Sequence, residues 1–172
     1  GRTLILPPSD GHHAPVGAVV HASGVLMDGI AANCTAAAVW TVDTPKGKTL
    51  STIEQQGLSL QPLQGAVLFS SVTALLGSAG QSNYTAANSK LDFDAHARQT
   101  AGVPYTSIQW GAWGDSGMAA RNSQVTKRFE RLGLGVLKGS QGMRSLEGVM
   151  KAVLSHAGRH ASTLAQVTAS PF

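Results

Sequence analysis

The chain has 172 residues, of which 42% are hydrophobic and 13% are charged, and its formal net charge is +4. An intrinsically disordered chain has few apolar residues and many uncompensated charges, so this composition predicts a folded chain of one domain or a large piece of one. The single cysteine, Cys34, excludes an internal disulfide and a cysteine-rich metal site. No apolar run approaches the roughly 20 residues that span a bilayer, and the lysines and arginines form no basic stripe. We therefore expect neither a membrane nor a nucleic acid as partner.

Apolar runs predict buried strands, and helical segments separate them. Residues 1–15, which contain Pro7, Pro8 and Pro15, are expected to form a connector to a domain of residues 16–172. In chain order we expect a strand at about 17–24, helices at about 29–41 and 48–56 interrupted at Pro45, a strand at 65–71, a helix at 82–101, a strand at 104–110, helices at 119–132 and 141–156, and a strand at 162–168. Strands that alternate with helices indicate an α/β fold with a parallel sheet.

The ends of the predicted strands are where chemistry is expected. Ligands of parallel α/β sheets bind at the carboxyl ends of the strands. Those ends carry Ser23-Gly24, Ser70-Ser71 and Trp110-Gly111. Each pair leads into a loop, and two of the three are polar or glycine-rich.

One polar constellation follows the second of these strands. Ser71 ends the strand, and Tyr84 lies 13 residues later, near the start of the long predicted helix. Asn88 is one helical turn beyond Tyr84 and shares its face, whereas Lys90 points elsewhere. A serine at a strand tip and a tyrosine on the next helix can converge on one carbonyl oxygen, which the serine would orient and the tyrosine would protonate.

This spacing resembles the short-chain dehydrogenase/reductase superfamily, and more closely the ketoreductase domains of polyketide and fatty acid synthases. The matching stretches are Val19-Val-His-Ala-Ser-Gly-Val25, Val67-Leu-Phe-Ser-Ser71, Gly77-Ser-Ala-Gly-Gln-Ser-Asn-Tyr-Thr-Ala-Ala-Asn88, Ser107-Ile-Gln-Trp-Gly-Ala-Trp113 and Gly117-Met-Ala119. The resemblance runs from about residue 16 to the end and implies a Rossmann-like doubly wound parallel sheet. It begins at the fourth strand of that fold, so we expect the first three strands and the glycine-rich pyrophosphate loop to be absent, leaving the C-terminal catalytic half with an exposed apolar edge strand.

The resemblance also places a lysine. Most superfamily members carry a lysine one turn after the tyrosine, whereas synthase ketoreductases carry asparagine there and supply the lysine from upstream, after a proline. Asn88 fits the second pattern, and Pro45-Lys46 matches the upstream site, with Lys48 as the alternative.

The resemblance further implies a role for each residue. Tyr84 would donate the proton, Ser71 would hold the carbonyl oxygen and Asn88 would hold a water that relays protons. The Lys46 ammonium would bind a ribose hydroxyl and is expected to lower the pKa of Tyr84 by favouring the phenolate. The residues implied to bind NADPH are Ala22, Ser23, Gly24, Lys46, Trp110 and Gly111.

Positions that control stereochemistry in the family point to one product. B-type ketoreductases carry Leu-Asp-Asp shortly after the first strand of this region, and here the stretch is Leu26-Met27-Asp28. A-type domains carry a tryptophan eight residues before the tyrosine, where this chain has Leu76. With Met118 as a further position near the substrate, the resemblance implies a B-type domain and a D-configured 3-hydroxyl.

The implied activity is NADPH-dependent reduction of a 3-ketoacyl thioester on an acyl carrier protein. Other synthase domains, including the N-terminal half of the ketoreductase, would be partners, and cytoplasmic placement is the default. Two alternatives stay open: a non-catalytic structural remnant of a synthase ketoreductase, and a free-standing short-chain reductase. The intact Ser71, Tyr84 and Asn88 favour an enzyme over a remnant, and Asn88 argues against the free-standing reductase.

Overall fold

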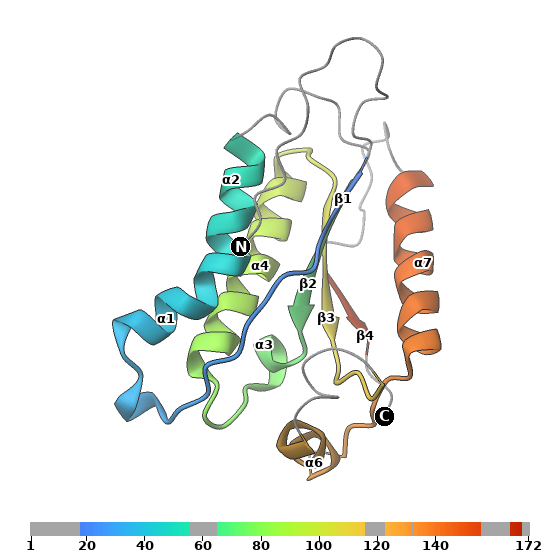
Figure 1. Ribbon diagram of the computed structural model, residues 1–172. Helices are drawn as coiled ribbons and strands as arrows, with labels where there is room; N and C mark the ends of the chain where they lie inside the picture. The colour runs from blue at the N-terminus through green and yellow to red at the C-terminus, as the bar shows by residue number, and fades with distance from the viewer. Residues whose placement is uncertain (1–17, 56–64, 116–122, 132, 156–165, 170–172) are drawn as a thin grey trace.

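The computed structural model describes residues 18–55, 65–115, 123–131, 133–155 and 166–169. Four strands form one sheet in the order β1-β2-β3-β4: β1 Ala18–His21, β2 Gly65–Ser71, β3 Tyr105–Trp110 and β4 Gln166–Ala169. Each neighbouring pair is parallel (Figure 1). All four carboxyl ends therefore lie at one edge of the sheet, as predicted.

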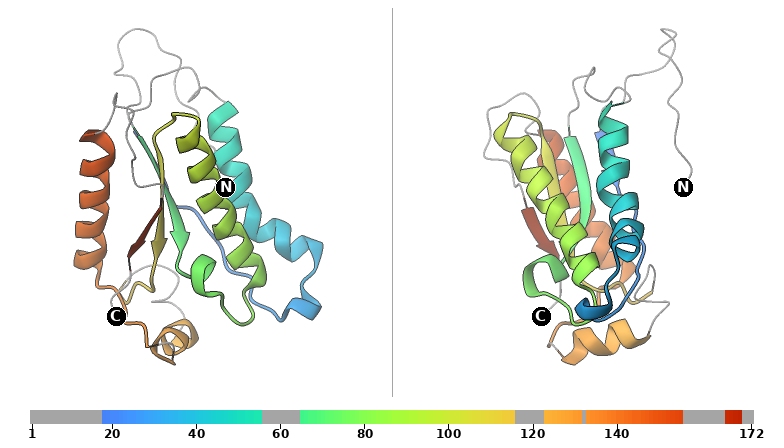
Figure 2. Two further views of the ribbon diagram at one scale, coloured as in Figure 1. Left: turned by 180° about the vertical axis from the view of Figure 1, so that it is seen from behind. Right: turned by 90° about the vertical axis from the view of Figure 1, so that its left-hand side faces the viewer.

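Helices cover both faces of the sheet, which confirms the predicted doubly wound α/β fold. On one face lie α1 Ala36–Asp43, α2 Thr49–Gln55 and α4 Ser82–Thr100, and on the other lies α7 Gly139–Ser155 (Figure 2). The short helices are η1 Ala31–Asn33 and α3 Thr73–Leu76. Helix α6 Ser123–Arg131 lies beyond the carboxyl ends of β2 and β3 (Figure 1).

The two faces of the central strands bury different side chains. Val67 and Ile108 pack with Val153 of α7 in one cluster. Leu68 packs with Leu91 of α4 in a cluster on the opposite face. Successive residues of a strand point to opposite faces, so a strand covered on both sides needs a continuous apolar run. This is why β2 and β3 were predictable from the sequence.

The predicted interruption at Pro45 is met in part: α1 ends at Asp43 and α2 begins at Thr49, but the segment between them is helical. Helix α1 continues through a π-helical segment, η2 Thr44–Lys48, directly into α2. Pro45 lies in the first turn of η2, where the wider π turn accommodates a residue that has no N–H to donate. The helical stretch also begins later than predicted, because Thr35 caps α1: its hydroxyl accepts from the Ala38 N–H at 3.2 Å.

The sequence predictions miss one helix, and some of them fall on residues that the structure does not describe. Helix α3 was not predicted, because its four residues are too few for a periodic pattern. The connector 1–15, residues 119–122 of a predicted helix and residues 162–165 of a predicted strand lie outside the described residues. Within the described ranges, no helix combines the length and apolar character needed to cross a membrane.

Candidate active site

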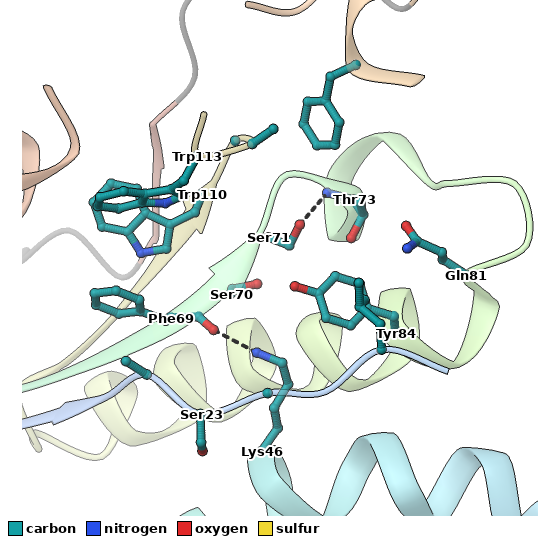
Figure 3. A pocket seen from close by; sticks show the side chains of 16 residues that line it. Ser23, Lys46, Phe69, Ser70, Ser71, Thr73, Gln81, Tyr84, Trp110 and Trp113 are labelled. Atoms are coloured by element: carbon teal, nitrogen blue, oxygen red, sulfur yellow. Dashed lines mark hydrogen bonds between the residues drawn. The ribbon is translucent and has the colours of Figure 1, made fainter. Parts of the chain in front are cut away.

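A pocket of about 370 Å³ lies at the carboxyl ends of β1, β2 and β3 (Figure 3). It is lined by Ser71 and Tyr84, by Phe69, Thr73, Gln81, Trp113 and Phe129, and by every residue predicted to bind the cofactor: Ala22, Ser23, Gly24, Lys46, Trp110 and Gly111. The fold thus brings together residues that are far apart in the sequence. The loops after the strands meet here because the strands are parallel and in register.

Tyr84 and Asn88 occupy adjacent turns of one face of α4, as predicted. The Asn88 side-chain amide donates to the main-chain oxygen of Tyr84 at 2.7 Å, and Asn88 is completely buried. The Ser70 hydroxyl donates to the main-chain oxygen of Asn88 at 3.2 Å, which ties α4 to β2. The Tyr84 hydroxyl points from α4 toward Ser70 and Ser71 at the end of β2 (Figure 3).

The predicted lowering of the Tyr84 pKa is not found. Burial raises the pKa of Tyr84, since the phenolate loses its hydration, and the negative charge of Asp28 adds to the rise. The neighbouring Asn88 and Ser71 side chains only partly oppose this. The Lys46 ammonium stands 5.7 Å from the centre of the Tyr84 ring, and its hydrogen bond goes elsewhere.

Lys46, and not Lys48, reaches the pocket. Lys46 is 2% exposed, and its ammonium donates to the main-chain oxygen of Phe69 in β2 at 2.9 Å. Lys48, two residues later on the same π-helical segment, is exposed. Burial lowers the pKa of Lys46 to about 8, and the Asp92 carboxylate works in the opposite direction.

The end of β1 holds the segment that carries Lys46. His21 is buried, and its Nε2 donates to the main-chain oxygen of Lys46 at 3.0 Å. The Ser23 hydroxyl donates to the main-chain oxygen of Pro45. Burial lowers the pKa of His21, which keeps its imidazole neutral at pH 7. Local sequence patterns do not predict these two contacts, because they join positions more than 20 residues apart.

The three residues predicted to control stereochemistry lie in different places relative to the pocket. Asp28 stands beside the pocket, where both of its carboxylate oxygens accept from the Gln81 amide, at 3.0 and 3.1 Å. Leu76 is 54% exposed and does not line the pocket. Met118 lies outside the described residues. Gln81 itself was not predicted, although its place three residues before Tyr84 could have drawn attention to it.

The pocket offers groups that suit the nicotinamide and ribose end of a dinucleotide. The buried Lys46 ammonium, several hydroxyls, among them those of Ser71 and Tyr84, and aromatic rings line one cavity (Figure 3). Among the described residues, four buried side-chain atoms have no hydrogen-bond partner: the Thr73 and Thr85 hydroxyls, the Asn88 oxygen and the Trp110 indole nitrogen. Of these residues, Thr73 and Trp110 line the pocket. Buried polar groups are satisfied in most proteins, so these two fit a site that receives polar partners from outside the chain. No described strand is followed by a glycine-rich loop that could hold a pyrophosphate.

Comparisons with known proteins agree with this geometry. A family model described as KR domain matches residues 5–115. A phenolphthiocerol synthesis polyketide synthase of type I from Mycobacterium marinum is 39% identical over 142 residues, which cover 81% of this chain and 7% of that protein.

Solved structures agree as well. An A-type ketoreductase from a modular polyketide synthase superposes with a TM-score of 0.80 at 28% identity, covering 92% of this chain and 31% of that one. The first ketoreductase of the tylosin synthase superposes with a TM-score of 0.75 at 34% identity, covering 90% and 32%. The chain belongs to the family of ketoreductase (KR) domains of modular polyketide synthases.

Proposed function

We propose that this chain reduces the 3-keto group of an acyl thioester, carried on an acyl carrier protein, to a 3-hydroxyl with NADPH. Membership of the KR family implies ketoreduction in polyketide synthesis, and the substrate, cofactor and residue roles are our proposal. The observation that carries it is the convergence of Ser71, Tyr84 and Lys46 on one pocket at the strand ends. This convergence also favours an active domain over a structural remnant.

Ser71 is the proposed group that orients the substrate. Its hydroxyl oxygen accepts from the Thr73 N–H at 3.2 Å, and its hydroxyl hydrogen can donate to a ketone oxygen. When bound, NADPH supplies a hydride to the keto carbon. As negative charge then develops on the ketone oxygen, the Ser71 hydrogen bond strengthens, which stabilises the transition state more than the ground state.

Tyr84 is the proposed proton donor. Its raised pKa keeps the hydroxyl protonated at neutral pH, and the hydroxyl points to the same end of β2 as Ser71. Proton transfer from Tyr84 to the developing alkoxide completes the 3-hydroxyl and leaves a phenolate. The Lys46 ammonium, 5.7 Å from the ring centre, would stabilise that phenolate and would donate to a ribose hydroxyl of the cofactor.

The phenolate must regain a proton for the next turnover. The buried side-chain oxygen of Asn88 lacks a hydrogen-bond partner among the described residues, whereas its amide nitrogen donates to the main-chain oxygen of Tyr84. A water bound to this oxygen would satisfy it and carry a proton toward Tyr84. Asn88 is therefore the proposed holder of the relay water.

The proposal includes the stereochemistry and the domain organisation. The Asp28 carboxylate holds the Gln81 amide at the pocket, and we assign this pair to steering the ketone for a D-configured, B-type product. Residues 16–172 would form the catalytic part of the domain, with 1–15 as a connector. The chain spans only 7% of the mycobacterial relative, so the N-terminal half of the domain and other synthase domains are the proposed partners.

The experiment that tests this function uses the complete polypeptide that carries these residues. A 3-ketobutyryl thioester on the carrier protein is offered with NADPH or NADH that bears deuterium at the transferable position. We expect faster oxidation of NADPH than of NADH, and a 3-hydroxybutyryl product with one deuterium on carbon 3. A folded polypeptide that consumes neither cofactor would support the structural remnant instead.

A further inference from the structure

The ring of Trp113 forms part of the pocket wall and rests directly on helix α7 at Gly142. A Cβ atom on Gly142 would lie 2.3 Å from Cη2 of Trp113, and 2.6 and 2.7 Å from its Cζ3 and Cζ2. Carbon atoms in contact are separated by about 3.5–4.0 Å. Only glycine at position 142 is therefore compatible with the place that this ring occupies.

The backbone around Trp113 is fixed on the same side. The Leu137 N–H donates to the Ala112 oxygen at 2.7 Å, and the Gly114 N–H donates to the Leu137 oxygen at 2.9 Å. These two bonds enclose Trp113 in a parallel bridge with Leu137. If an added atom collides with the ring, the backbone of Trp113 therefore does not readily shift to relieve the collision.

Helix α7 is anchored at its start and along its length. The Gly139 N–H at its start donates to both carboxylate oxygens of Asp115, each at 2.9 Å. Further along, Val149 and Val153 are buried against Val67 and the rest of that cluster. With the helix and the backbone of Trp113 both anchored, a side chain at position 142 would displace the indole ring itself.

The Trp113 ring belongs to a row of aromatic rings that extends into the site. Its centre lies 5.0 Å from that of Trp110, and Trp110 lies 5.1 Å from Phe69. All three rings line the pocket, and Phe69 also supplies the main-chain oxygen that binds Lys46. The row is an apolar wall next to the proposed catalytic groups, which suits the alkyl part of an acyl chain.

We propose that Gly142 is a specificity-determining position. Because glycine has no side chain, the Trp113 ring can lie against α7, and its position there sets the volume available to the acyl group. The inference rests on the proposed function and concerns the substrate size that the site accepts. Even an alanine at position 142 would turn the Trp113 ring toward the cavity and select smaller acyl groups. Gly142 does not line the pocket, so it acts through Trp113 as a positioning residue.

The test compares Gly142→Ala with Gly148→Ala in the complete polypeptide. Both glycines lie in α7, but a Cβ at Gly148 meets nothing within 4 Å, so this control carries the same gain in helix propensity without the collision. The substrates are 3-ketoacyl N-acetylcysteamine thioesters with progressively longer chains. We expect Gly142→Ala to lower kcat/KM for long relative to short chains by about tenfold, the discrimination that one methylene gives in an apolar pocket. Gly148→Ala should keep the wild-type ratio.

A second variant separates the displaced ring from a general loss of structure. The colliding atoms belong to the outer ring of the indole, so Trp113→Phe combined with Gly142→Ala should restore the acceptance of long chains. If the single and the double variant lose long chains equally, the assignment to Trp113 is overturned. It is also overturned if active Gly142→Ala retains the wild-type selectivity.

A measurement without turnover keeps the inference distinct from the proposed function. Trp110 and Trp113 are close enough for their transitions to couple, so their near-ultraviolet circular dichroism reports the position of the Trp113 ring. We expect a changed band in Gly142→Ala and an unchanged band in Gly148→Ala. If the wild type reduces no ketone, the proposed function fails, while this spectrum still decides whether Gly142 seats the ring. An unaltered spectrum in Gly142→Ala would overturn the inference.

Discussion

Lys46 donates a hydrogen bond to the main-chain oxygen of Phe69 at 2.9 Å, which joins a π-helical turn to the neighbouring strand β2. The π segment continues the helix past Pro45 and carries the Lys46 side chain that reaches this acceptor. A π turn inside an α-helix often marks a functional position. Here it turns Lys46 into the site and leaves Lys48 exposed.

The first prediction concerns the pH dependence of stability. The pKa of Lys46 is about 8 in the folded chain and 10.5 in an unperturbed one, so between these values the unfolded chain binds more protons. The free energy of unfolding therefore rises with pH through this window, in total by about 3 kcal/mol from this group. In Lys46→Met the free energy of unfolding should not show this rise, as measured by chemical denaturation from pH 7 to 10.5. The exposed Lys48→Met should keep it, and equal slopes in both variants would refute the assigned pKa.

The second prediction concerns the proton relay. Asn88→Ala removes the buried oxygen proposed to hold the water, so we expect kcat to fall by about a hundredfold or more, the usual scale for a lost proton-transfer group. KM should change little, because Asn88 does not line the pocket. Steady-state kinetics in light and heavy water would measure this. Asn83→Ala also removes buried side-chain hydrogen bonds made from α4 and serves as the control. If kcat falls equally in the two variants, Asn88 acts only on the stability of the fold.

The third prediction concerns stereochemistry. Asp28→Ala frees the Gln81 amide from its carboxylate partner, whereas Asp28→Asn retains one side-chain oxygen as acceptor. We expect the L-configured product to increase in Asp28→Ala and to increase less in Asp28→Asn, as measured by chiral chromatography of the 3-hydroxyacyl product. A wild-type product that is already L-configured would show that the B-type assignment is wrong.

The parts of the fold that were predictable are those with strong local patterns. Strands β2 and β3 are continuous apolar runs bounded by turns, and α4 ends at Thr100, shortly before Gly102 and Pro104. Their predicted bounds agree with the structure to within about one residue. The serine, tyrosine and asparagine of the site could be found as well, because their spacing along one strand and the next helix fixes their relative placement.

The parts that were not predictable depend on contacts between distant segments. The π turn at Pro45 is held by His21 and Ser23, which no local pattern connects to it. The raised pKa of Tyr84 follows from burial, which only the packed structure determines. The contact of Trp113 with Gly142 likewise joins a loop to a helix that local spacing does not relate.

The central claim is that Tyr84 protonates the ketone. Its most direct test is single-turnover reduction of a 3-ketoacyl thioester by Tyr84→Phe in the complete polypeptide, beside Tyr105→Phe. Tyr105 binds Glu54 at the amino end of β3, away from the pocket, and removing its hydroxyl should leave the rate close to that of the wild type. We predict that Tyr84→Phe is slower by about a hundredfold to ten-thousandfold while remaining folded. Reduction by Tyr84→Phe at the wild-type rate would contradict the account.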